Sequence, residues 1–166
     1  MPTASPLYRW KFHDPMLLSL FPITYVLHLT EEWFAPVPIV HWAARAERPL
    51  DPAVFIIANG IGLSLMLNGI WLAQRMTRFR WIVPALATAV LLNTFGHLVG
   101  SVSMGGYSAG LVTASIFWIP LGMLTLMRVW DQATRRTLVA GLIVGFAIEI
   151  IVVVTLPLIS AARSSF

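Results

Sequence analysis

The chain has 166 residues, of which 58% are hydrophobic and only 11% are charged, and its mean hydropathy is +0.80. A soluble domain carries roughly 25% charged residues, so this composition excludes an ordinary soluble protein and indicates an integral membrane protein. The formal net charge of +4 does not point to a nucleic-acid partner, because the basic residues flank apolar runs, where they orient the chain and contact lipid headgroups. Cysteine is absent, which excludes disulfides, thiolate catalysis and cysteine-ligated metal.

The first predicted membrane helix covers residues 15–35. Asp14-Pro15 is typical of a helix start, since the aspartate accepts hydrogen bonds from the first backbone N–H groups and proline suits the first helical position. Pro22 predicts a kink within the helix, and the Ala-Pro-Val-Pro segment at 35–38 ends it. No small-residue cleavage site follows a short apolar core near the amino end, so we expect no removable signal peptide.

Four further apolar runs follow, each about long enough to cross a bilayer. Asp51-Pro52 repeats the helix-start signal, and Asp131 is expected to cap the last helix. Gly141 and Gly145, four residues apart, permit close contact with a neighbouring helix. We therefore predict an all-α fold, a single polytopic membrane bundle of five transmembrane helices that comprises residues 1–166. The predicted spans are 15–35, 52–74, 81–101, 108–127 and 137–160.

The basic residues are divided unequally between the two sides of this predicted bundle. Eight belong to the side of the amino end: Arg9, Lys11, Arg75, Arg78, Arg80, Arg128, Arg135 and Arg136. Three belong to the other side: Arg45, Arg48 and Arg163. Because cytoplasmic loops carry the excess of lysine and arginine, we predict a cytoplasmic amino terminus and an external carboxyl terminus. Ten arginines against one lysine are typical of a GC-rich bacterial genome, so we expect a multi-pass protein of the bacterial cytoplasmic membrane.

Ionisable residues within the predicted spans mark the candidate site, because charged groups are expensive to bury in a membrane. His28, Glu31 and Glu32 share one face of the first helix, since residues three and four apart are neighbours. Asn93 and His97 likewise share a face of the third helix. At about 1.5 Å per residue, both sets lie about 3–10 Å outward of the membrane midpoint. We therefore expect the two faces to meet in the outer half of the membrane.

His28-Leu-Thr-Glu31-Glu32 resembles the defining motif of the HXXEE family of small, uncharacterised membrane proteins. The short multi-span chain and the later Asn93-xxx-His97 pattern agree with that resemblance. It implies that His28, Glu31 and Glu32 are the signature positions of the family, and it implies no particular reaction.

The leading hypothesis is a divalent metal site for zinc or iron. Histidine and glutamate three or four residues apart on a helix can ligate one ion, as in carboxylate-bridged helical bundles. Mixed imidazole and carboxylate ligands suit zinc and non-haem iron. Glu149, near the middle of the last span, can complete the ligand set, and Asn93 can orient His97. The predicted metal ligands are His28, Glu31, Glu32 and His97.

We accordingly predict a membrane enzyme whose metal activates water or oxygen toward a hydrophobic lipid or isoprenoid-like substrate. Its expected partners are membrane lipid and that small-molecule substrate, and association into a homo-oligomer stays open. His13 and His41 lie outside the predicted spans and are expected to be solvated or interfacial. The predicted catalytic residues are Glu31, Glu32, Glu149 and Asn93.

Three alternatives stay open. In a metal-free site, a buried glutamic acid would protonate an isoprenoid and a neighbour would take a proton back, which is isomerase or cyclase chemistry. Aromatic side chains would then shield a cation. A small proton-coupled or metal carrier is the second alternative, although the polar groups crowd one leaflet and no inverted repeat is visible. In the third, the polar groups satisfy one another, and Glu31 and Glu32 extend to the membrane surface.

Overall fold

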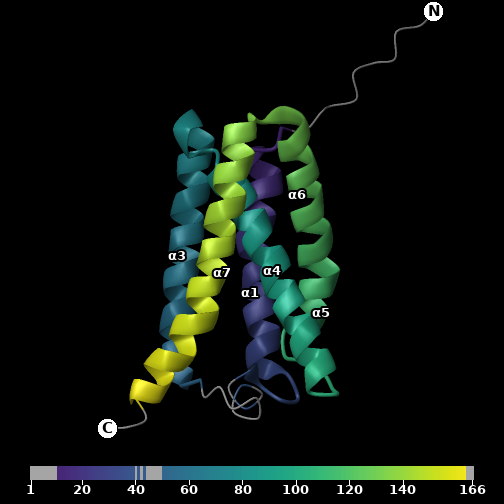
Figure 1. The fold of residues 1–166 in the computed structure, drawn as a ribbon, viewed down its shortest axis with the longest axis vertical. Helices are drawn as coiled ribbons and strands as arrows, with labels where there is room; N and C mark the ends of the chain where they lie inside the picture. The colour runs from purple at the N-terminus through teal and green to yellow at the C-terminus, as the bar shows by residue number, and fades with distance from the viewer. Residues whose placement is uncertain (1–10, 40, 42, 44–49, 164–166) are drawn as a thin grey trace, which may run out of the picture.

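The computed structural model describes residues 11–39, 41, 43 and 50–163, and all regular structure in these ranges is helical. The long helices of the described residues run side by side, with successive helices in opposite directions (Figure 1). The first described helix, α1, begins at one end of the bundle, and the last, α7, finishes at the other. The elements are α1 (Pro15–Phe34), α3 (Pro52–Arg75), the 3₁₀ turn η1 (Thr77–Phe79), α4 (Ile82–Ser103), α5 (Leu111–Thr113), the π-helical segment η2 (Ala114–Trp118), α6 (Ile119–Gln132) and α7 (Arg135–Arg163).

Four helical segments in the described ranges are long and apolar enough to cross a membrane, which is compatible with an integral membrane protein. They are Pro52–Arg75, Thr77–Ser103, Leu111–Gln132 and Arg135–Ala162. The prediction of five such helices is therefore wrong by one. The first predicted span, α1, is missing from this set because two prolines, one histidine and two glutamates dilute its apolar residues. It nevertheless packs in the bundle beside the other helices.

Helix starts agree with the sequence at α1 and α3. Asp14 accepts a hydrogen bond from the Met16 N–H at 2.9 Å, and Asp51 accepts from Ala53 and Val54 at 2.8 and 3.0 Å. These side chains satisfy backbone donors that have no partner inside the helix.

The prediction that Asp131 caps the last helix is wrong, because α6 continues through Asp131 to Gln132. Thr134 takes that role instead, since its hydroxyl accepts a hydrogen bond from the Thr137 N–H at 3.2 Å. The fully buried Val129 packs the last turn of α6 into the core, which extends that helix past the predicted end of the span at 127.

The long helix α7 packs tightly on α4 through two glycines. A Cβ at Gly141 would lie 2.3 Å from Pro84 Cγ, and a Cβ at Gly145 would lie 2.5 Å from the Ala85 carbonyl oxygen. The predicted close contact is thus confirmed. Small residues allow such an approach, and in a membrane this packing stabilises helix association more than exclusion of water does.

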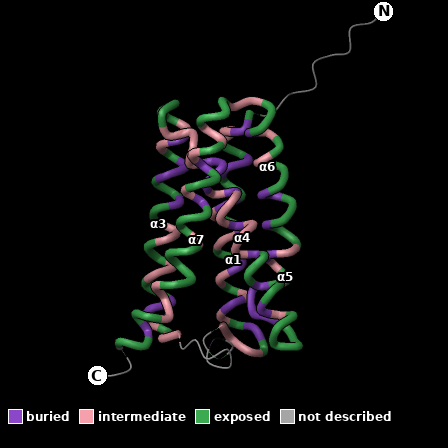
Figure 2. The backbone as a smooth tube through the Cα atoms, in the orientation of Figure 1, coloured by how far each residue is buried: buried purple, intermediate pink, exposed green. Residues whose placement is uncertain are grey.

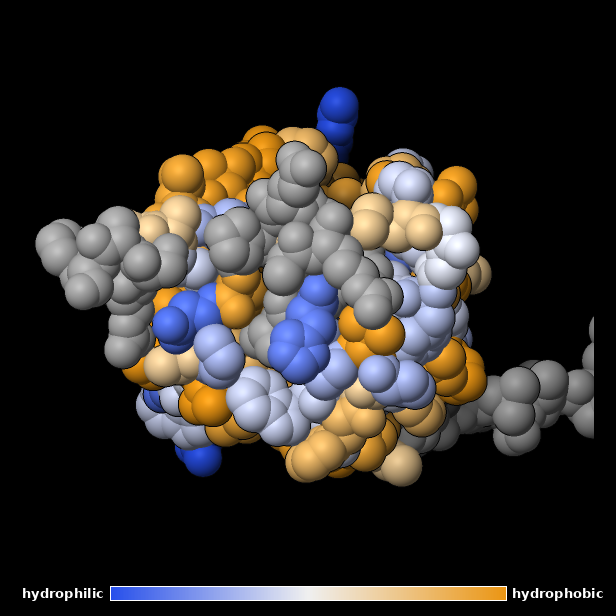
Figure 3. All heavy atoms as spheres, turned by 90° about the horizontal axis from the view of Figure 1, so that it is seen from below, coloured by the Kyte–Doolittle hydropathy of each residue, from blue (hydrophilic) through white to orange (hydrophobic). Residues whose placement is uncertain are grey.

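The core lies between α1, α3, α4 and the α5–α6 segment, and buried residues gather on the inward faces of these helices (Figure 2). Phe21, Val83 and Trp118 are among its most buried members. Large hydrophobic side chains remain exposed along α1, α3 and α7, as expected for helices that contact lipid. Seen from the end at which α5 begins, hydrophilic residues lie near the middle and hydrophobic ones along much of the border (Figure 3).

Candidate metal centre

Three buried ionisable side chains meet between α1 and α4. His28 and Glu32 are one helical turn apart on α1, and His97 comes from α4, with exposed fractions of 2%, 8% and 8%. Nε2 of each histidine lies 3.6 Å from the same Glu32 oxygen, Oε1. One ligand atom from each residue lies within 4.8 Å of the other two. The predicted convergence of the first and third apolar helices is therefore present.

The orientation of the His28 ring is fixed by a chain of hydrogen bonds. Its Nδ1 lies 3.0 Å from Thr113 Oγ1, and that hydroxyl donates to the Gly110 carbonyl at 3.3 Å. The Thr113 side chain also hydrogen-bonds Glu31. Because the single threonine proton is directed to one of these two acceptors, the hydroxyl oxygen accepts from His28 Nδ1–H. The tautomer that satisfies this chain leaves a lone pair on Nε2.

His97 is held in a similar way. Its Nδ1 lies 3.3 Å from the hydroxyl of the fully buried Ser108, while its Nε2 is directed at Glu32. The two imidazole rings meet edge to face at 5.0 Å. Hydrogen bonding at the nitrogen that faces away from an ion is the usual way in which proteins orient a metal-binding histidine.

This arrangement calls for a positive charge between the three side chains. A lone pair on His28 Nε2 and a carboxylate oxygen are both acceptors, so their approach to 3.6 Å is favourable only with a proton or cation between them. With bonds of about 2.0–2.1 Å, ligand atoms around a tetrahedral zinc lie about 3.3–3.4 Å apart. The two measured separations of 3.6 Å are close to that value. This buried group could therefore hold a divalent ion.

A tight turn covers the centre. Gly110 has φ +90°, a left-handed conformation that favours glycine. A Cβ at this position would lie 2.5 Å from His28 Cε1, 2.9 Å from His97 Cε1 and 3.0 Å from Glu32 Cγ. Only glycine fits both the backbone and the space, so the turn lies directly against all three side chains.

Glu31 lies outside the three-residue cluster and holds this turn in place. Its carboxylate accepts hydrogen bonds from the Val112 and Thr113 N–H groups at 3.0 and 2.6 Å, at the start of α5. It also accepts from the Tyr107 hydroxyl. Burial, followed by this hydrogen bond, raises the pKa of Tyr107 to about 12. Glu31 thus caps a helix that follows it by some 80 residues, and a carboxylate is favourable there because helix N-termini carry partial positive charge.

The π-helical segment η2 places Trp118 against the same centre. The indole ring lies 3.9 Å from the His28 ring and stacks on Tyr25 at 6.3 Å, measured between centroids. Its Nε1 donates to Thr24 Oγ1 at 3.2 Å. Short π-helical segments are frequent at functional sites. Here the segment turns a large aromatic ring onto the back of a candidate ligand.

The remaining predicted residues form a second polar pair between α4 and α7. The Asn93 side chain hydrogen-bonds the Glu149 carboxylate, and Glu149 interacts electrostatically with Glu32. Asn93 Oδ1 is buried without a hydrogen-bond partner among the described residues. Asn93 therefore pairs with Glu149, and the predicted orienting role toward His97 belongs to Ser108.

Several residues of the site carry no motif that sequence reasoning uses. Ser108, Gly110 and Thr113 lie in or just after a turn of small residues. Trp118 is one of seven tryptophans, and nothing in its local sequence distinguishes it from the others. The sequence feature that could have indicated this turn is Gly110, a glycine directly before an apolar helix. Its contacts depend on how α1 and α4 pack, which local sequence does not specify.

Comparison with known families agrees with the motif. The family described as proteins of unknown function with an HXXEE motif matches residues 19–125. That region covers more than half of the chain and contains all three residues of the candidate centre. The chain belongs to this HXXEE family. Comparisons with curated proteins and with solved structures gave no match.

Proposed function

We propose that the protein is a membrane enzyme that binds a divalent metal ion through His28, Glu32 and His97 and acts on a hydrophobic substrate. One observation supports the metal most strongly. Two imidazole Nε2 atoms point at a single carboxylate oxygen while their Nδ1 atoms are held by hydroxyl groups. Three protein ligands are the number that catalytic zinc sites use, which leaves a coordination position open for water or substrate.

Two imidazoles and one carboxylate suit zinc or non-haem iron(II). When bound, such an ion supplies Lewis acidity, or in the case of iron the activation of oxygen. The protein's own contribution is to fix the ligands and to keep the surroundings dry. The turn at Gly110 covers one side of the centre and the Trp118 ring lies against another.

Glu149 and Asn93 are placed to handle a proton. The Glu149 carboxylate lies on a membrane-spanning helix and interacts with Glu32 without belonging to the three-residue cluster. Ionisable residues at such positions are functional by default because their burial is costly. We assign Glu149 the role of proton donor or acceptor for the substrate, with Asn93 as the residue that positions it.

A groove supports a hydrophobic substrate. It has a volume of about 340 Å³ and lies between α1 and α3, where Trp33, Phe55 and Leu63 line it and Asn59 adds a polar group. Asn59 accepts a hydrogen bond from the Tyr25 hydroxyl at 2.6 Å, and Tyr25 stacks on Trp118. One layer of side chains thus connects the groove to the centre. A lipid or isoprenoid chain fits this mainly apolar lining.

A metal-free acid–base enzyme is the second candidate. A proton shared between Glu32 and a histidine would satisfy the same pair of acceptors as a metal ion. Isomerisation or cyclisation of an isoprenoid would then be the expected class of reaction. For the membrane itself, we propose the bacterial cytoplasmic membrane, with the amino terminus on the cytoplasmic side as the basic residues favour.

Elemental analysis of the detergent-purified protein tests the leading proposal. About one zinc or iron per chain is expected in the wild type. The ion should be lost in His28→Ala and in His97→Ala and retained in His41→Ala, a histidine that is exposed. Absence of metal after reconstitution with several divalent ions would overturn the metal proposal and favour the acid–base alternative.

A further inference from the structure

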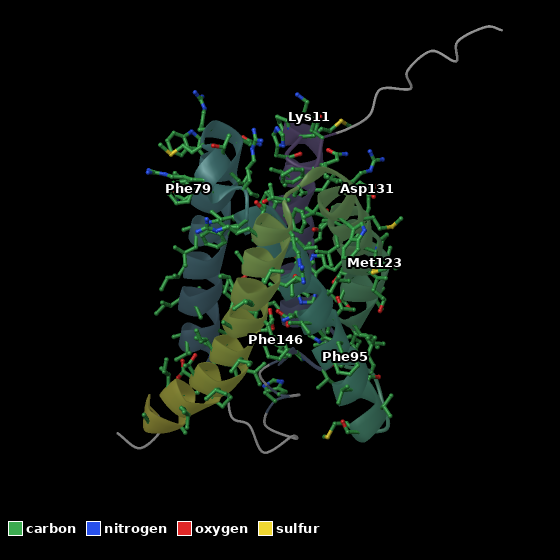
Figure 4. All side chains as sticks on the ribbon, turned by 45° about the horizontal axis from the view of Figure 1, so that its top comes forward. Lys11, Phe79, Phe95, Met123, Asp131 and Phe146 are labelled. Atoms are coloured by element: carbon green, nitrogen blue, oxygen red, sulfur yellow. The ribbon has the colours of Figure 1, made fainter. Side chains whose placement is uncertain are left out.

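We propose that Lys11, His13 and Arg80 form a binding site for a phosphate group, supplied by an anionic membrane lipid or by free phosphate. The site lies at the end of the bundle where Lys11 and Phe79 are labelled in Figure 4. His28 follows His13 by fifteen residues, most of them helical, so this end is about 20 Å from the candidate metal centre. The site is therefore separate from the proposed catalytic chemistry.

Two buried nitrogen atoms at this end lack a hydrogen-bond partner among the residues that the structure describes. They are His13 Nδ1 and Arg80 Nε. Arg80 Nε is always a donor, and His13 Nδ1 is a donor in the charged ring and in one neutral tautomer. Leaving a buried polar atom unpaired is unfavourable, and such atoms commonly mark a ligand or an ordered ion. An anion that accepts from both nitrogens would remove this deficit.

Among the described residues, the charges that act on His13 are mainly positive. Arg80 and Lys11 act on His13, and burial followed by these two charges lowers the pKa of His13 below 6.5. The Asp14 carboxylate opposes this effect, and it also accepts a hydrogen bond from the Met16 N–H. The ten residues at the amino end contain no aspartate or glutamate. An external anion is therefore the partner that suits this charge.

The donors are held by ordered turns on two separate segments. The turn of Lys11 to Asp14 is closed by the Asp14 N–H at 2.9 Å, and buried Phe12 donates its N–H to Gln132. Arg80 N–H donates to Thr77 O, and Arg80 O accepts from Val83, both at 3.2 Å. Both segments are thus fixed before a ligand binds, which lowers the entropy lost on binding.

The location of the site relative to the helix ends indicates the source of the phosphate. Position favours a lipid phosphate in particular. The site lies where α3 ends at Arg75 and α4 begins, which is the headgroup level for helices that cross the bilayer. Seven basic and two acidic side chains of the described residues share this end: Lys11, Arg75, Arg78, Arg80, Arg128, Arg135 and Arg136 against Asp14 and Asp131.

Native mass spectrometry of the full chain in detergent, titrated with phosphatidylglycerol or phosphatidylcholine, tests the site. Wild type should bind phosphatidylglycerol in preference to phosphatidylcholine. Arg80→Gln should weaken phosphatidylglycerol binding about tenfold or more, because a charged hydrogen bond is lost. Arg78→Gln is the matched control, since this exposed arginine lies over the Phe79 ring at 4.8 Å and should leave binding within about twofold.

Inorganic phosphate distinguishes the two sources. If phosphate raises the unfolding temperature of wild type but not of Arg80→Gln, and displaces phosphatidylglycerol, the site takes free phosphate. If only the lipid binds, the ligand is the headgroup. His13→Ala provides a second variant in case Arg80→Gln folds poorly, and a ligand-free unfolding temperature equal to that of the wild type would report an intact bundle. Equal losses in Arg78→Gln and Arg80→Gln would overturn the proposal, because a diffuse basic surface would then explain the binding.

Discussion

Replacement of Gly110 by alanine should disrupt the candidate centre more than any other single methyl group added to the chain. The added Cβ would lie 2.5, 2.9 and 3.0 Å from atoms of His28, His97 and Glu32, distances at which at least one of these side chains must move. The left-handed backbone at φ +90° costs a non-glycine residue about 1–2 kcal/mol. Overpacking adds about 1–3 kcal/mol. A total destabilisation of about 2–5 kcal/mol follows.

Gly105→Ala is the matched control for this prediction. Gly105 also has a positive φ, of 64°, but an added Cβ there meets nothing within 4 Å. It should therefore lose only the backbone contribution and keep its metal. Thermal unfolding and metal content of the two purified variants are the assays. If Gly110→Ala matched Gly105→Ala in both, the turn would not lie against the ligands and this account of the site would be refuted.

Three further predictions follow from the same contacts. Thr113→Val removes the acceptor that orients His28, so metal affinity measured by competition with a chelator should fall about 10–100-fold; unchanged affinity would show that the hydroxyl does not fix the ring. The raised pKa of Tyr107, about 12 against an ordinary value of 10, means that the folded state retains its proton longer. Wild type should therefore lose stability between pH 10 and 12 relative to Tyr107→Phe, and parallel pH curves would contradict this. Gly145→Ala should destabilise the bundle, whereas Gly96 has open space around it, so Gly96→Ala should stabilise the bundle by about 0.5–1 kcal/mol, as alanine does in a helix. Thermal unfolding that shifts in the same direction for both variants would contradict the tight α4–α7 contact.

The sequence could place the helices and bring the right side chains to one level because both properties are local. Apolar runs and aspartate-proline starts indicate where each helix begins and ends. The fixed rise per residue of a helix then gives the depth of each side chain in the membrane. His28, Glu32 and His97 therefore appear at one level before any tertiary contact is known. Depth alone does not predict which atoms meet; the 3.6 Å separation of His97 Nε2 from Glu32 Oε1 depends on how α1 and α4 pack.

The different roles of Glu31 and Glu32 could not be predicted from the sequence. Both lie one turn from His28, at spacings of three and four, and both are compatible with ligation on helical geometry alone. What separates them is their neighbours. Glu32 is directed at His97 from α4, whereas Glu31 meets the free N–H groups of α5. The outcome depends on which helices flank α1, and that is a property of the assembled bundle.

Helix termini and the covering turn show the same limit. Aspartate is a residue type that often caps helices, but Asp131 lies inside α6. Tertiary packing of the buried Val129 outweighs this local preference. The positive φ of Gly110 and the π-helical segment that ends at Trp118 arise where α5 must pass close to α1. No pattern within a single segment encodes such contacts between distant parts of the chain.

X-ray absorption spectroscopy of the zinc-loaded protein tests the central claim most directly, because it counts the imidazole ligands of the ion. The account predicts two imidazole nitrogens and carboxylate oxygen at about 2.0–2.2 Å in the wild type. His97→Ala should show a single imidazole, and Glu31→Gln should retain both because Glu31 lies outside the cluster. A wild-type spectrum without imidazole scattering, or one that His97→Ala leaves unchanged, would contradict a centre built from His28, Glu32 and His97.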